Sequence, residues 1–151
     1  MVVLDPQWIA AAQAAMAKWK VPASVSLAQF GLESGWGRKM PGNNPFGIKH
    51  MPGYADQHFL THEVVDGQRV TEQQTFAVFA TLAQAFDVHA RLIATHPVYA
   101  AAMVALDGTA TGLAKFVTLM GAHYATAPDY AHQLMAIIQG DALTRYDVAA
   151  K

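Results

Sequence analysis

The chain has 151 residues, of which 53% are hydrophobic and 14% charged, a composition typical of one globular domain with its own core. It contains no cysteine, which excludes disulfides, thiolate metal sites and cysteine nucleophiles. A net charge of −1, with no run of Lys or Arg, argues against a nucleic-acid partner.

The sequence gives no sign of a cleavable signal or of a membrane span. Its first residues, MVVLDP, lack a basic region, and no long apolar run follows them. No uncharged apolar run reaches the roughly 18 residues that a spanning helix needs. We therefore expect the protein to reach its target by release or delivery rather than through a cleavable signal. We also expect it to be a monomer.

Two helices are predicted before residue 35. Asp5 followed by Pro6 is a typical helix start, and apolar residues then recur at helical spacing. A second helix is predicted from about 22–24 until Gly35 stops it. From 35 to 56 the chain is rich in Gly and Pro, which predicts an ordered loop without regular structure. A loop of this length inside a compact domain is usually functional.

A β-hairpin is predicted next, because Asp66-Gly67 lies between two β-rich segments. Its strands are expected near 58–65 and 68–76. A two-residue turn pairs Glu63 with Val70 and places Phe59, Thr61, Glu63 and Val65 on one face.

The rest of the chain is predicted to be helical. Thr81 and Gln84 form a capping box, and the helix that they open must end before Pro97. Short helices are expected at about 98–106 and 111–122, and Pro128 is expected to open a last helix that Gly140 closes. The sequence thus predicts an α+β, mostly α, single domain over 1–151, with a loop-and-hairpin insertion at about 35–76.

Glu33 is the most suggestive titratable residue. It falls in the last turn of the second predicted helix, where the helix dipole disfavours an anion. Trp36 can cover it and exclude water, which also raises a carboxyl pKa. A protonated carboxylic acid is what a glycosidase needs to protonate a leaving oxygen. A lone Glu near a helix end is more often a solvated surface residue, but its Gly-Trp-Gly neighbourhood favours the catalytic interpretation.

Two motifs carry a family resemblance. The segment LAQFGLESGWG followed by NNPFGIK resembles the glucosaminidase domains of glycoside hydrolase family 73. Three later segments, THEVVDG, TFAVFATLAQAFDVHARLI and HYATAPDYAHQLMAII, resemble further blocks of that family. The similarity spans about residues 5 to 139, nearly the whole chain.

The resemblance implies a lysozyme-like fold, with a helical lobe and a small β-lobe facing each other across a groove. It implies endo-acting hydrolysis of the β-1,4 bond after N-acetylglucosamine in peptidoglycan, with no cofactor. Glu33 corresponds to the family's general acid, Glu63 to its second carboxylate and Tyr124 to a tyrosine of the catalytic centre. The sequence departs from the family pattern at Ala77, His123 and Ala127, which puts substrate positioning in question.

The role of the second carboxylate stays open. Glu63 could activate a water for inverting chemistry, which places the carboxyl groups roughly 6.5–9.5 Å apart. Alternatively the N-acetyl group of the substrate acts as nucleophile and Glu63 only assists. Glu72 is the fallback if the strand register slips by one residue.

Several other side chains are candidates for substrate binding. Asn44 matches the family motif, and the aromatic residues of the loop region would bind sugar rings if exposed; we favour packing for Phe46 and Phe59. Tyr124 is expected in the groove, whereas Tyr130 is expected mainly to pack. The candidate substrate-binding residues are thus Trp36, Asn44, Phe46, Tyr54 and Tyr130.

Other chemistries have weaker support. The seven histidines show no metal-ligand spacing, and His62-Glu63 lacks the second histidine of a zinc protease motif. No serine lies in a nucleophile-elbow pattern. The alternatives that remain are a muramidase or lytic transglycosylase of the same fold, and a glycan-binding module that has lost catalysis.

Overall fold

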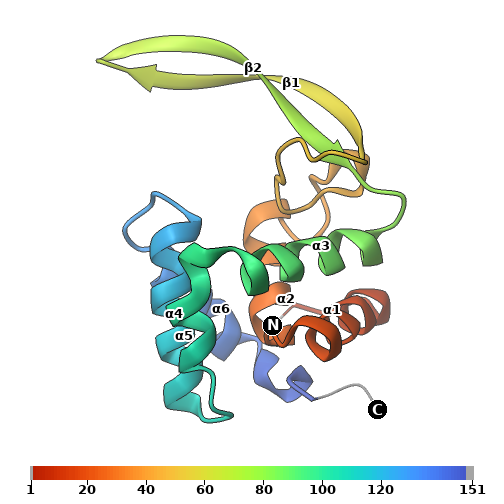
Figure 1. Cartoon of the computed structure of the whole chain (residues 1–151), viewed down its shortest axis with the longest axis vertical. Helices are drawn as coiled ribbons and strands as arrows, with labels where there is room; N and C mark the ends of the chain where they lie inside the picture. Colours follow the sequence, from red (N-terminus) through yellow and green to blue (C-terminus); the bar gives the residue numbers. More distant parts are fainter. Residues whose placement is uncertain (1, 149–151) are drawn as a thin grey trace.

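The computed structural model describes residues 2–148, apart from the side chain of Glu63. In this part of the chain a lobe of six α-helices is joined to one two-stranded antiparallel ribbon (Figure 1). The elements are, in chain order, α1 (Pro6–Trp19), α2 (Ala23–Ser34), η1 (Pro41–Asn43), β1 (Ala55–Val65), β2 (Gln68–Val78), α3 (Leu82–Thr95), η2 (Pro97–Tyr99), α4 (Ala100–Ala105), α5 (Ala110–Tyr124), α6 (Tyr130–Gly140) and η3 (Leu143–Tyr146).

The helix starts confirm the capping signals in the sequence. The Asp5 side chain accepts a hydrogen bond from the Gln7 N–H at 2.8 Å and opens α1. The Thr81 hydroxyl accepts from the Gln84 N–H at 3.1 Å and opens α3. In each case the side chain satisfies a backbone donor that the first helical turn leaves free.

The core of the helical lobe forms around α2. Every residue from Ala23 to Gly31 is buried, and the helix contacts α1, α3, α6 and η3. Such a helix is held by packing on all sides. Its C-terminal end is therefore a fixed point, at the edge of the lobe that faces the ribbon (Figure 1).

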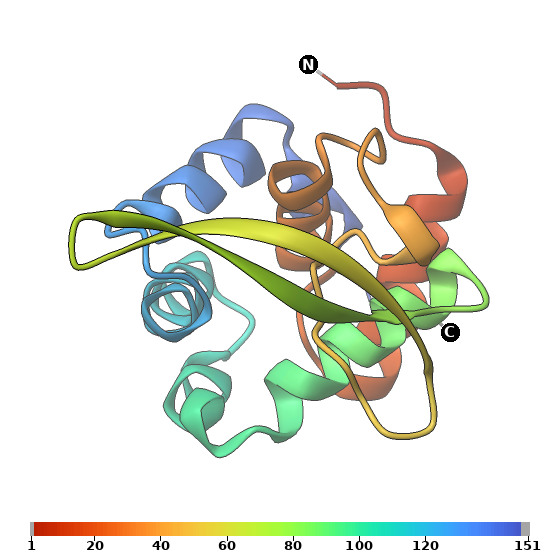
Figure 2. The ribbon, with the colours of Figure 1, turned by 90° about the horizontal axis from the view of Figure 1, so that it is seen from above.

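The ribbon has the predicted register. Glu63 pairs with Val70, Thr61 with Glu72 and Val65 with Gln68 around the Asp66-Gly67 turn. The strands are longer than expected, starting at Ala55 and ending at Val78, because pairing continues down to the base of the hairpin. Seen from above, the twisted ribbon crosses over the helical lobe (Figure 2).

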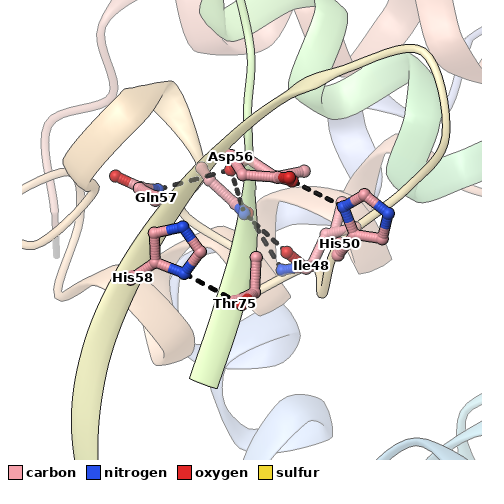
Figure 3. Close-up of polar contacts among 8 residues, drawn as sticks. Ile48, His50, Asp56, Gln57, His58 and Thr75 are labelled. Atoms are coloured by element: carbon pink, nitrogen blue, oxygen red, sulfur yellow. Dashed lines mark hydrogen bonds and ion pairs between the residues drawn. The ribbon is translucent and has the colours of Figure 1, made fainter. Parts of the chain in front are cut away.

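Polar contacts hold the base of the ribbon to the preceding loop (Figure 3). His50 of the loop has its Nδ1 2.6 Å from Asp56 Oδ1 on β1. Within the ribbon itself, His58 Nδ1 lies 3.0 Å from the hydroxyl of Thr75 on the opposite strand. Gln57 Nε2 donates to the Pro41 carbonyl at 2.7 Å. The loop is thus more regular than predicted: it contains η1 and a one-residue bridge to β2.

The structure near the C-terminus differs from the sequence prediction in one helix boundary and one additional element. Pro128 does not open α6, because residues 127–129 form a turn closed by the Tyr130 N–H donating to the Ala127 carbonyl. The helix begins at Tyr130 instead. The sequence prediction also did not include η3, which packs on α2. No helix in residues 2–148 is both long enough and apolar enough to cross a bilayer.

Candidate active site

Glu33 lies at the end of the buried helix α2, where the structure places the predicted acid. Gly35 follows in a left-handed conformation and ends the helix, so the chain turns away directly after Glu33. The side chain as a whole is exposed, yet it borders two pockets, one on each side. Glu33 therefore contributes to the lining of both pockets.

We call these depressions the ribbon pocket and the tyrosine pocket. The ribbon pocket, of about 280 Å³, is lined by Glu33, Lys39, Pro41, Asn44, Pro45, Gly47, Gln57, Phe59 and Phe76. The tyrosine pocket, of about 470 Å³, is lined by Glu33, Phe46, Gly47, Ile48, Lys49, His89, Leu92, Ile93, His96, Tyr99, Tyr124 and Ala125. Only Glu33 and Gly47 line both.

A chain of hydrogen bonds leads from Glu33 into the core. The Tyr130 hydroxyl donates to Glu33 Oε1 at 3.0 Å. Gln29 Nε2 in turn donates to the Tyr130 hydroxyl oxygen at 3.2 Å. Tyr130 and Gln29 are both buried, so the bond between them is shielded from water, whereas the bond from Tyr130 to Glu33 is part-buried.

Burial raises the pKa of the Glu33 carboxyl, and the hydrogen bond from Tyr130 partly opposes that rise. Burial raises the pKa of Tyr130 and of Tyr124 as well, so both phenols stay protonated. The site thus combines an acid that holds its proton to higher pH than usual with two neutral hydroxyl groups.

Tyr124 and His89 form one wall of the tyrosine pocket. The ring of Tyr124 stacks on that of Tyr130, with centroids 5.6 Å apart and an interplanar angle of 13°. It also meets the ring of His89 edge-on at 5.8 Å. Tyr124 is half-buried, so its aromatic surface forms part of the wall beside Glu33.

Trp36 does not cover Glu33. Its indole lies against Trp8 and Phe30, each with a centroid distance of 6.2 Å, and over Gly31. Trp36 lines neither pocket. Tyr54 is also outside both pockets, because its ring packs edge-on against Phe79 at 5.5 Å.

Asn44 and Phe46 reach the pockets but are engaged by their own loop. The Asn44 side chain donates to the carbonyls of Ile48 and Ala77, both at 2.9 Å, and accepts from the Ile48 N–H at 3.0 Å. Phe46 is buried and stacks on His89. These residues shape the site from behind, as we expected for Phe46.

The sequence predicts that Phe59 packs in the loop region, but the structure places it at the surface of the ribbon pocket. It is 41% exposed and lines the ribbon pocket together with Phe76, whose ring centroid is 6.1 Å away. Phe59 thus presents an exposed aromatic face to the ribbon pocket.

The candidate second carboxylate is placed only by its backbone. Glu63 pairs with Val70 near the ribbon end, and its side chain lies outside the described structure. Glu72 is exposed on β2 opposite Thr61. No group of three or more potential metal ligands occurs among the residues that the structure describes.

Sequence reasoning missed Gln29, His89 and Gly47 as members of the site. Gln29 precedes Glu33 by four residues, so helical spacing alone places both on one face. The predicted register could have found the ribbon-pocket pair Gln57 and Phe76, which face each other across the strands. His89 carries no comparable signal, because its place depends on how α3 packs.

Comparisons with known proteins identify the family. A family model described as mannosyl-glycoprotein endo-beta-N-acetylglucosaminidase matches residues 9–143. The chain is 33% identical over 128 residues to the peptidoglycan hydrolase FlgJ of Salmonella typhimurium. The aligned segment covers 79% of this chain and 39% of that protein. It is also 36% identical over 136 residues to a probable N-acetylmuramidase of Lactococcus lactis. That alignment covers 84% of this chain and 30% of the muramidase.

The chain therefore spans less than half the length of these two relatives. Among solved structures, it superposes on the catalytic domain of the autolysin Auto from Listeria monocytogenes with a TM-score of 0.82 and 25% identity. That match covers 97% of this chain and 91% of the other.

Proposed function

The chain belongs to the glucosaminidase family, glycoside hydrolase family 73, and from this premise we propose that it hydrolyses the β-1,4 bond after N-acetylglucosamine within peptidoglycan strands. Its fold is the lysozyme-like fold of that family's solved domains. The observation that carries the proposal is Glu33, an acid with a raised pKa at the junction of two pockets. A polymer lying across both pockets would present a linkage, rather than a chain end, to this acid.

Glu33 is the proposed general acid. Its protonated carboxyl gives a proton to the glycosidic oxygen as the bond to the sugar carbon breaks. The raised pKa keeps a larger fraction of the acid protonated near neutral pH than an ordinary glutamate would have. Tyr124, on the wall beside it, is proposed to orient the sugar that reacts.

Glu63 is the proposed second carboxylate, by its family position on the ribbon. It would act either as the base that activates water or as a helper to the substrate's own N-acetyl group. The stereochemistry of the first product separates the two routes. Proton NMR should show an α-anomer if Glu63 activates water in a single displacement, and a β-anomer if the N-acetyl group participates.

The cleaved bond can be identified by mass spectrometry of a digest of purified, reduced cell walls. New reducing ends on N-acetylglucosamine, in fragments of several disaccharides, support the proposal. The Glu33→Gln variant should release none, since an amide cannot supply the proton. Wild-type protein that releases no fragment, or a fully active Glu33→Gln variant, would contradict it, and the first result would identify a binding module.

A muramidase is the second candidate, because one relative is named a probable N-acetylmuramidase. The same digest then carries its reducing ends on muramic acid, and a transglycosylase leaves anhydro-muramic ends. Release of single sugars alone would indicate attack from a strand end. In each case the site of action is the cell wall, outside the cytoplasm.

A further inference from the structure

Gln29 lies beneath the proposed acid, with no contact to either pocket. It is fully buried on α2, one helical turn before Glu33. Its side-chain nitrogen is 3.2 Å from the Tyr130 hydroxyl oxygen and 3.7 Å from the Met120 sulfur. An amide is costly to bury, so its place under the site needs an explanation.

The direction of the hydrogen bonds follows from the chemistry of the three groups. An ionised carboxylate can only accept, so Tyr130 must donate its single hydroxyl hydrogen to Glu33. Gln29 must then present its N–H to the hydroxyl oxygen, as it does here. With a donor nitrogen on one side and Glu33 on the other, the Tyr130 hydrogen has one acceptor, Glu33 Oε1.

This arrangement also determines the protonated state of Glu33. While Tyr130 donates to Oε1, the proton that Glu33 carries belongs on Oε2. Among the side chains that the structure describes, none forms a hydrogen bond with Oε2. That oxygen is the one left free for a substrate.

We infer that Gln29 is a positioning residue that selects which oxygen of Glu33 holds the transferable proton. The inference rests on the proposed function, since it assigns Glu33 as the acid. Without the Gln29 amide the Tyr130 hydroxyl can rotate and accept a proton from Oε1. Glu33 would then hold its proton against Tyr130 in a fraction of molecules, and those molecules would be inactive.

The test is a double-mutant cycle with Gln29→Met and Tyr130→Phe. Methionine has a similar shape and no N–H, and it suits a site beside Met120. Gln29→Met should lower kcat about twofold to tenfold with KM unchanged, and should move the alkaline limb of kcat to higher pH, because Glu33 loses a fixed donor. The double variant should be no worse than Tyr130→Phe alone, because Gln29 acts only through Tyr130.

A control removes a side-chain amide elsewhere. Gln13 Nε2 donates to the Tyr146 carbonyl at 3.3 Å, and Gln13→Met should leave kcat and its pH profile unchanged. Additive losses in the cycle, or an unmoved alkaline limb in Gln29→Met, would overturn the inference. An active Glu33→Gln variant would instead overturn the proposed function, so the two failures are distinguishable.

A measurement on the wild-type chain needs no variant that might fail to fold. In NMR spectra above the pKa of Glu33, the Tyr130 hydroxyl hydrogen should be protected from exchange, with a cross-peak to the Gln29 NH₂ hydrogens. Carbon-13 titration of Glu33 should report a higher pKa in Tyr130→Phe, since a donor to the anion is lost. A rapidly exchanging hydroxyl hydrogen without that cross-peak would contradict the assigned direction.

Discussion

His89 is a buried imidazole whose two ring nitrogens have no hydrogen-bond partner among the described residues. The ring lies in the wall of the tyrosine pocket and stacks on the ring of Phe46, with centroids 3.9 Å apart. Burial lowers the pKa of His89 to about 3. The ring is therefore neutral in the folded chain over the whole physiological range.

This histidine should make stability depend on pH. The unfolded chain binds a proton at His89 below about pH 6.5, and the folded chain only near pH 3. Unfolded molecules thus bind more protons across that window, so the free energy of unfolding falls as pH falls. The slope is at most roughly 1.4 kcal/mol per pH unit. Urea unfolding at a series of pH values should show a shallower dependence in His89→Leu.

His132 serves as the control, because it is exposed on α6. His132→Gln should keep the wild-type dependence between pH 6.5 and 3. At neutral pH, His89→Leu should also be at least as stable as wild type, since two unpaired polar atoms are removed. A variant with the same slope as wild type would show that His89 titrates freely in the folded chain.

At the scale of one element, α2 depends on a glycine that the indole of Trp36 covers. A β-carbon at Gly31 would lie 2.5 Å from two indole carbons. Gly31→Ala should therefore push Trp36 away from Trp8 and Phe30 and cost about 1–3 kcal/mol. The loss is measurable as a lower urea midpoint.

Gly140 offers a matched comparison in α6. Nothing lies within 4 Å of a β-carbon built there, and its backbone is helical. Gly140→Ala should be neutral or slightly stabilising. Equal midpoints for the Gly31 and Gly140 variants would mean that the indole moves aside without cost.

The elements were predictable where a local signal decides them. Asp5 and Thr81 mark helix starts through bonds within one turn, and Asp66-Gly67 fixes the register of the whole ribbon. The contacts of the site are different in kind. Tyr130 reaches Glu33 across 97 positions of sequence, and Trp36 turns back onto Gly31 instead of covering the acid. Spacing along the chain holds no information on such packing.

At the scale of the whole molecule, the site consists of two lobes with Glu33 between them. The helical lobe supplies the acid, and the ribbon, which crosses over that lobe (Figure 2), contributes Gln57, Phe59 and Phe76 to the lining of the ribbon pocket. The exposed fraction of Leu60 is 69% and that of Val64 is 74%, so the ribbon is not held by packing there.

The junction of the two pockets should be sensitive to a single methyl group at Gly47. Gly47 lines both pockets and has φ +65° with open space where a β-carbon would be. Gly53 has φ +89° and equally open surroundings, but lies in neither pocket. Alanine at either position should cost a similar 1–2 kcal/mol or so of backbone strain. Only Gly47→Ala should slow the clearing of cell-wall suspensions, by about tenfold, because the methyl group displaces the glycan from Glu33. Equal clearing rates for the two variants would show that the substrate does not lie across both pockets.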